Sequence, residues 1–314
     1  MTKNVKGVNW NSATDPINRE VWDRLTSNFW LDTAVPLSGD IASFRKLSPK
    51  ERDTFVKVFT GLTVLDSLQG AYGAVSMIDD TEDLQEQAVY QFISAQEAIH
   101  AKSYSTIFST LIPTPEINEA FDWAEASEYI QNKAKLIKEF YSGKDKHLKK
   151  IGSVILESFL FYTGFYYIFH LASQGITTAS CEIIRLILRD ENLHGYFIGY
   201  KYQTDPELDK ETYEDMAINL AMDLMDLEIG YAHTLYDELG LFHEVEAFLQ
   251  YNCNKALANL GIMPIYPKET ATPPPEIIAS LDPTGNSNHD FFSAKGSSYT
   301  LVSSEESTDE DWEF

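Results

Sequence analysis

The sequence predicts an all-α protein built as one large helical bundle. Between the helix start at residues 48–51 and residue 260, prolines occur only at positions 113, 115 and 206. The segments between these breaks repeat apolar residues at helical spacing, and no alternating pattern typical of strands competes with them. Because the links are short, neighbouring helices should run mostly antiparallel.

The expected elements follow one another with few breaks. Residues 1–48 should form an irregular arm with a short helix near 17–30. Ser48 then fits the N-cap position of a helix, with Pro49 at the first turn and Glu51 able to complete a capping box. The helices expected from there are 49–79, 82–110, 116–141, 146–173, 177–201, 207–238 and 242–260.

The composition changes after the last expected helix. A proline-rich stretch leads into a polar, acidic and serine-rich segment, which is typical of disorder. This tail nevertheless keeps aromatic residues, which suggests that it folds onto a partner. We therefore expect one helical domain over residues 1–285 and a flexible docking tail over 286–314.

Charge and cysteine content exclude several classes of protein. The 314-residue chain has a net charge of -24 and a pI near 4.5, which argues against nucleic-acid binding. Cys181 and Cys253 are interpreted as buried thiols in a reducing cytosol, and the N-terminus has no apolar signal segment. The apolar stretch 153–173 resembles a membrane span, but it carries Glu157 and His170. It is better explained as the central helix of a large bundle, and we expect the protein to be cytoplasmic.

Acidic and histidine side chains recur in a repeated pattern along the expected helices. Two helices carry a Glu-x-x-His pair, and the Glu of each pair follows a carboxylate on an apolar helix by 31 or 34 residues. The residues in question are Asp66, Glu97, His100, Glu157, Glu191 and His194. One carboxylate from each of two helices and Glu-x-x-His from two more is the pattern of dinuclear metal sites in helical bundles.

The chemistry of these six side chains fits two metal ions. Glu and His three positions apart point the same way and can share one ion, while the Glu can bridge to a second. Four carboxylates balance two divalent ions, and an oxo or hydroxo bridge can compensate for their oxidation. Donors of N and O without thiolate suit Fe or Mn. The alternative is that Asp66 and Glu157 form buried ion pairs, but no Lys or Arg lies one turn from either.

With these motifs, the chain resembles the small, radical-generating subunit of class Ib ribonucleotide reductase. The resemblance runs from NFWLDTAVPLSGD (28–40) through QEAIHAKSY and RDENLH to the acidic end DEDWEF. It implies a ferritin-like helical bundle and a dinuclear Mn or Fe centre held by the six residues named above. It also implies an oxidoreductase that supplies deoxyribonucleotides for DNA replication.

The resemblance implies further roles close to the metal ligands. Tyr104, one turn after His100, matches the tyrosine that carries the radical. Helical spacing alone does not distinguish it from Tyr162 or Tyr166, which also lie near Glu157 in sequence. Pocket positions around the radical are matched by Phe161, Phe165 and Ile187, although ordinary core packing would explain these three equally well.

A relay to another protein is also implied. Asp190 would contact His100 and Trp30, since metal-bound histidines commonly donate their other N–H to a carboxylate. Tyr299 on the tail would pass the oxidising equivalent on to the large catalytic subunit.

The remaining partners also follow from the resemblance. They are a second copy of the chain in a homodimer and a flavodoxin-like activating protein, with Ser158 and Tyr162 as candidate linings of an oxidant channel. The two cysteines of this chain cannot supply the thiols for ribose reduction in this family, so that step belongs to the large subunit.

Two other functions use the same bundle. A different di-metal oxidase or desaturase would need the six ligands but neither Trp30 nor an aromatic acidic tail. A ferritin-like iron store is a non-catalytic alternative. Both predict that no stable organic radical forms.

Overall fold

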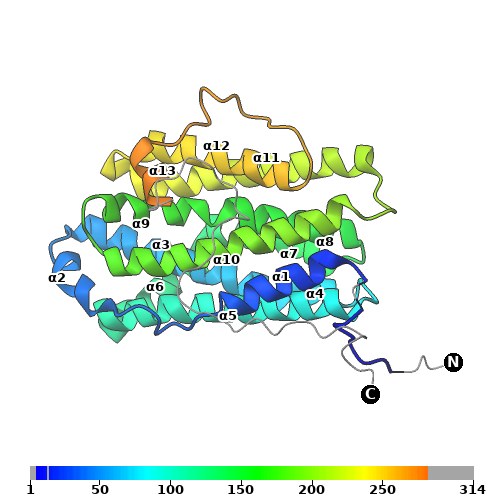
Figure 1. Ribbon diagram of the computed structural model, residues 1–314. Helices are drawn as coiled ribbons and strands as arrows, with labels where there is room; N and C mark the ends of the chain where they lie inside the picture. Colours follow the sequence, from blue (N-terminus) through cyan, green and yellow to red (C-terminus); the bar gives the residue numbers. More distant parts are fainter. Residues whose placement is uncertain (1–4, 13, 282–314) are drawn as a thin grey trace, which may run out of the picture.

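The computed structural model describes residues 5–12 and 14–281, and all regular structure in this part of the chain is helical (Figure 1). The prediction of an all-α bundle is therefore confirmed. The expected start of the first long helix is also confirmed, because Ser48 and Glu51 form a capping box at its N-terminus. The predicted tail, including Tyr299, lies outside the described residues.

The helices lie mostly side by side along one axis. The α-helices are α1 (Pro16–Ser27), α2 (Ile41–Phe44), α3 (Pro49–Leu68), α4 (Ala74–Ile78), α5 (Leu84–Leu111), α6 (Thr114–Ala126), α7 (Glu128–Ser142), α8 (Lys146–Ile155), α9 (Tyr162–Ser173), α10 (Thr178–Gln203), α11 (Lys210–Tyr236), α12 (Phe242–Asn259) and α13 (Pro275–Leu281). The 3-10 turns are η1 (Leu37–Asp40) and η4 (Asp237–Leu239), and the π-helical turns are η2 (Gln69–Gly73) and η3 (Leu156–Leu160).

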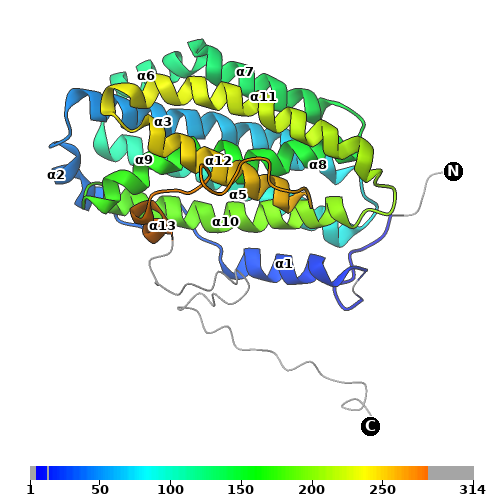
Figure 2. The same cartoon turned by 90° about the horizontal axis from the view of Figure 1, so that it is seen from above.

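Helix packing places α3, α5, α10 and the segment from α8 to α9 around a common interior. Helix α5 packs against α3 and α4, while α10 packs against α8 and α9. Helices α11 and α12 cover one side of this group, and α1 lies outside α5 and α10 on another side (Figures 1 and 2). The segments that carry the predicted ligands are thereby brought to the centre of the bundle.

The structure differs from the sequence prediction in one long helix and in three short elements. The single helix expected over 116–141 is wrong, because Ser127 adopts an extended conformation and separates α6 from α7. No proline or glycine marks this break, so residue type did not reveal it. The short elements η1, α2 and α13 were not predicted either.

Two of the expected helices contain π-helical turns. Turn η2 interrupts the helix expected over 49–79, and η3 interrupts the one expected over 146–173. A π turn inserts extra chain into a helix and is frequently found at functional sites. Here, one follows Asp66 and the other contains Glu157.

The segment Lys146–Ser173 is the one described helix long and apolar enough to cross a membrane by length and composition. However, 94% of its most apolar window is buried inside the protein. The interpretation of this stretch as the central helix of the bundle is therefore confirmed. The two thiols, Cys181 and Cys253, are also buried, as predicted.

Candidate metal centre

Each predicted ligand comes from the expected helix. Asp66 lies near the end of α3, Glu97 and His100 lie on α5, and Glu157 lies in η3. The second Glu-x-x-His pair lies on α10. All six side chains are completely shielded from solvent, with relative exposures of 0%.

The six residues form two overlapping groups. One contains Asp66, Glu97, His100 and Glu191, and the other contains Glu97, Glu157, Glu191 and His194. Within each group, the donor atoms all lie within 4.8 Å of one another. Glu97 and Glu191 belong to both groups, so each would lie beside both ions if one ion occupied each group.

The two imidazoles point inward through the same ring nitrogen. His100 Nδ1 lies 2.8 Å from Glu191 Oε1 and 3.5 Å from Asp66 Oδ1. His194 Nδ1 lies 3.0 Å from Glu97 Oε1 and 3.6 Å from Glu157 Oε2. Nδ1 is therefore the nitrogen of each ring that is available to an ion.

The inner atoms of this cluster have no hydrogen-bond partners outside the close carboxylate–imidazole contacts just given. They include both carboxylate oxygens of Asp66, Glu97 and Glu191, one oxygen of Glu157, and both Nδ1 atoms. Buried polar groups in proteins are otherwise nearly always hydrogen-bonded, and buried charges are paired or coordinate metals. The residues present therefore fit a pair of divalent cations.

Protonation behaviour supports the same interpretation. Burial raises the pKa of the Asp66 and Glu157 carboxyls well above their usual values. Burial alone would lower the pKa of His100, but Glu191 and other acidic neighbours raise it well above its ordinary value. Burial would raise the pKa of Glu191, but hydrogen bonds from Glu157 and the two imidazoles lower it instead. The cluster thus combines groups that hold protons with a carboxylate that does not, and cations would displace the protons.

The outward nitrogen of each imidazole has a different partner. His100 Nε2 lies 3.3 Å from Asp190 Oδ2, and Trp30 Nε1 donates to the same oxygen at 2.6 Å. The Trp30 and His100 rings stack with centroids 5.8 Å apart. His194 Nε2 instead lies 3.1 Å from Gln96 Oε1. The structure thus brings Trp30, Asp190 and His100 together.

Tyr104 lies in a dry part of the interior. Its side chain is 0% exposed, its hydroxyl has no hydrogen-bond partner, and its ring packs against Phe59 with centroids 5.5 Å apart. Burial, followed by the negative charge of Asp66, raises the pKa of the phenol well above 10. Tyr104 is therefore a neutral phenol next to the acidic cluster.

The three predicted pocket residues are fully buried on the segments that carry ligands. Phe161 and Phe165 follow Glu157, with ring centroids 5.8 Å apart, and Ile187 precedes Glu191 by one turn of α10. Their positions fit both a dry pocket wall and ordinary core packing.

Polar residues lie on the α12 side of the cluster. Asn259 donates to Ser158 Oγ at 3.0 Å, and the Tyr162 hydroxyl is buried without a partner. Lys255 Nζ lies 5.5 Å from the centroid of the Tyr162 ring, and burial lowers the pKa of this ammonium to about 8.

Sequence reasoning missed two glutamines that contact the candidate ligands. Gln96 accompanies His194, and Gln69 Nε2 donates to Glu157 Oε1 at 2.5 Å. Each was a polar residue in a largely apolar helical context, and Gln69 follows Asp66 by about one turn. A polar side chain among apolar neighbours was the available signal, but it did not show which ligand each glutamine contacts.

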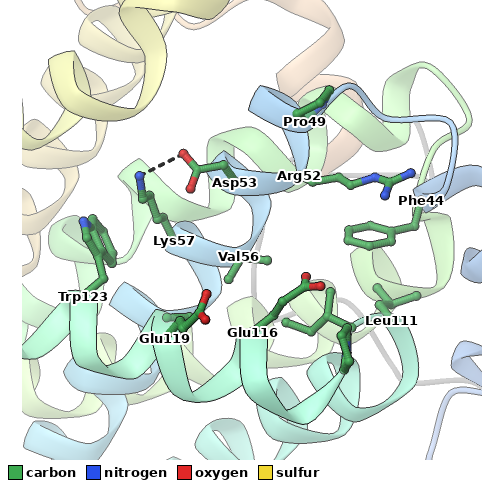
Figure 3. A pocket seen from close by; sticks show the side chains of 13 residues that line it. Phe44, Pro49, Arg52, Asp53, Val56, Lys57, Leu111, Glu116, Glu119 and Trp123 are labelled. Atoms are coloured by element: carbon green, nitrogen blue, oxygen red, sulfur yellow. Dashed lines mark hydrogen bonds and ion pairs between the residues drawn. The ribbon is translucent and has the colours of Figure 1, made fainter.

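A surface groove lies away from this cluster. It has a volume of about 460 Å³ and runs between α3 and the α5–α6 junction, with Phe44 and Trp123 near its two ends (Figure 3). An ion pair between Asp53 and Lys57 lines it. None of the six candidate ligands borders this groove, so the cluster does not open through it.

Comparison with known proteins agrees with this geometry. Residues 7–274 match the family described as ribonucleotide reductase, small chain. The chain is 47% identical to ribonucleoside-diphosphate reductase subunit beta nrdF1 of Mycobacterium tuberculosis (strain ATCC 25618 / H37Rv), over 100% of this chain and 99% of that protein. It is also 47% identical to ribonucleoside-diphosphate reductase 2 subunit beta of Escherichia coli (strain K12), over 99% of this chain and 98% of that protein.

A solved structure shares the fold over most of the chain. The dimanganese(II)-NrdF crystal structure from Streptococcus sanguinis has a TM-score of 0.85 and 43% sequence identity. The match covers 88% of this chain and 100% of that one.

Proposed function

The chain belongs to the ribonucleotide reductase small-chain family, and from this premise we propose that it generates a tyrosyl radical at Tyr104 for a class Ib enzyme. It is an oxidoreductase component that works with a large subunit. The six clustered side chains would hold the metal pair. When bound, this pair supplies the oxidising power that removes an electron from the phenol.

The residues around Tyr104 would preserve the radical once it forms. The phenol is neutral, so its oxidation releases a proton. Among the nearby carboxylates, Asp66 raises the pKa of this phenol most. Water and reductants are kept away by complete burial and by aromatic neighbours such as Phe59. Phe161, Phe165 and Ile187 are proposed to complete this dry wall.

Transfer toward the large subunit is proposed to use Trp30, Asp190 and His100. The observation that carries this proposal is the single oxygen, Asp190 Oδ2, that contacts both the indole and the imidazole. Asp190 can hold the indole proton while an electron moves between the rings. Tyr299 is proposed to continue the route on the tail that docks the large subunit.

Metal identity and activation remain part of the proposal. We propose a dimanganese centre, which is supported by the dimanganese(II) form of the Streptococcus sanguinis relative; iron uses the same donors. An oxidant from a flavodoxin-like activating protein would approach past Ser158 and Tyr162. The ammonium of Lys255 beside Tyr162 would favour an anionic oxidant.

A homodimer is also proposed. The outward face of α5 exposes Gln91, Ala95, Ala98 and Ser105, with Lys102 among them. Charged residues are depleted at the centre of an interface between subunits, and Lys102 is the single charged residue among these five. This face is the proposed contact with a second copy.

Electron paramagnetic resonance tests the central proposal. Protein loaded with Mn or Fe and then oxidised should give a tyrosyl signal, which Tyr104→Phe should abolish. Tyr236→Phe, a matched loss of one buried phenol that has no assigned role, should retain it. A full signal in Tyr104→Phe would assign the radical elsewhere. Absence of any organic radical in the wild type would favour a di-metal oxidase or an iron store.

A further inference from the structure

One buried amide joins the two π-helical turns. Gln69 begins η2, and Glu157 lies within η3. Gln69 Nε2 donates to Glu157 Oε1 at 2.5 Å and to Ser153 Oγ at 2.6 Å. Its Oε1 accepts a hydrogen bond from the Tyr141 hydroxyl at 2.6 Å. Both N–H groups and the oxygen of this 0% exposed amide therefore have partners.

The direction of the amide is determined by its neighbours. When Glu157 binds a cation it is ionised and only accepts hydrogen bonds, so Gln69 must then present its NH₂ group to it. Tyr141 must then donate to the amide oxygen. Burial, followed by the charge of Glu157, raises the pKa of Tyr141 well above 10, so the phenol keeps the proton that it donates. The chain Tyr141–Gln69–Glu157 therefore has one stable arrangement.

This arrangement leaves Glu157 with one free oxygen. Oε1 is held by the amide, whereas Oε2 has no partner and lies 3.6 Å from His194 Nδ1. Glu157 belongs only to the group that contains His194, and not to the group that contains His100. A contact that restrains Glu157 therefore acts on one of the two candidate metal positions.

We propose that Gln69 is a positioning residue that holds Glu157 as a single-oxygen ligand and so sets the affinity of the metal position beside His194. This inference rests on the dinuclear site of the proposed function. Asp190 and Gln96 contact the two histidines, whereas Gln69 controls a carboxylate that could otherwise rotate. The two metal positions are thereby made unequal by the protein.

The shape of η2 leaves room for the amide. A Cβ built on Gly73 would lie 2.0 Å from Gln69 Oε1 and 2.9 Å from Tyr141 Cζ. Because the amide is held on three sides, it cannot move aside without losing its hydrogen bonds. Gly73→Ala should therefore displace the side chain of Gln69. It does so without removing any of the side chains that form these hydrogen bonds.

Metal titration of the full-length, metal-free protein tests this inference. Gln69→Met keeps the length of the side chain but removes both donors. Calorimetry with Mn²⁺ should show one ion bound as in the wild type and a second bound about 10- to 100-fold more weakly. Electron paramagnetic resonance at one ion per chain should then show isolated Mn²⁺. Tyr141→Phe, which keeps the amide but removes the group that orients it, should weaken the same position by less.

A matched control separates positioning from general destabilisation. Gln85 is also buried, and its Nε2 donates to the backbone oxygens of Asn9 and Ser12 rather than to the cluster. Gln85→Met should lower stability but bind two ions with unchanged affinities.

Three results would count against these ideas, and they differ from one another. Unchanged affinities in both Gln69→Met and Tyr141→Phe, or equal weakening of both positions, would overturn the positioning role. If Gln69→Met does not fold, Tyr141→Phe alone decides between selective and unselective weakening. A wild-type protein that binds fewer than two ions would refute the dinuclear site itself.

Discussion

Replacing Asp190 should separate metal binding from the transfer of oxidising equivalents. Asp190 Oδ2 accepts from Trp30 Nε1 at 2.6 Å and lies 3.3 Å from His100 Nε2. Asp190→Ala leaves both buried donors without a partner. Each unpaired donor costs about 1–3 kcal/mol, so the free energy of unfolding should fall by about 2–6 kcal/mol.

The same change should weaken the metal site without abolishing it. His100 would lose the partner of its outward nitrogen, and loss of such a contact typically costs about 10- to 100-fold in metal affinity. At saturating metal, the protein should still load both ions and form the radical. Turnover with the large subunit should nevertheless fall to background, because no group remains to hold the Trp30 proton.

Asp190→Asn distinguishes the charge from the hydrogen bonds. An asparagine oxygen can accept from both Trp30 and His100, although its NH₂ then faces the guanidinium of Arg189, which is also a donor, so the Arg189–Asp190 Oδ1 ion pair at 3.4 Å is lost. Metal affinity should therefore stay closer to the wild type than in Asp190→Ala, while turnover remains low. Metal analysis, radical quantification and ribonucleotide reduction are measured on each variant. Wild-type turnover in Asp190→Ala, or complete loss of its metal, would refute the reasoning.

Removal of residues 295–314 should leave metal and radical intact but abolish turnover with the large subunit; undiminished turnover would contradict the docking role. Metal affinity should rise with pH, because the raised pKa values of Asp66 and Glu157 mean that metal binding displaces protons. Calorimetry in buffers of different ionisation enthalpy measures the release of these protons, and a metal affinity that does not change with pH would argue against the displacement. Lys133→Met should lower the free energy of unfolding by about 3–5 kcal/mol, because the buried carboxylate of Glu228 loses the ammonium that lies 2.5 Å from it. Denaturant unfolding measures this loss, and the double variant Lys133→Met/Glu228→Met is the control that should restore stability.

The candidate ligands could be predicted because their chemistry conflicts with their surroundings. Asp66 and Glu157 are acids within apolar helices, and each precedes a Glu-x-x-His pair by a similar distance. An unpaired charge cannot be buried, so the residues had to meet a counter-ion, and helical spacing determined which faces could meet. The family resemblance then separated Tyr104 from the other buried tyrosines, which the pattern alone could not do.

Other features left no comparable signal in the sequence. Ser127 ends one helix and precedes another without a proline or glycine, so only tertiary packing determines the break. The π turns depend on a single inserted residue, which local propensity does not encode. Gln69 has many ways to satisfy its amide in a helical core, and only the assembled bundle brings Glu157 to it.

The inserted residues also constrain how the chain can change in length. Each residue of a helix adds about 100° of rotation and about 1.5 Å of rise. A deletion within Gln69–Gly73 would restore regular winding and turn α4 relative to Asp66. Substitutions at this turn act on one contact, whereas a change in residue number would rotate the whole of α4 against α5, on which it packs. Homologous chains should therefore differ in amino-acid identity along this segment far more readily than in length.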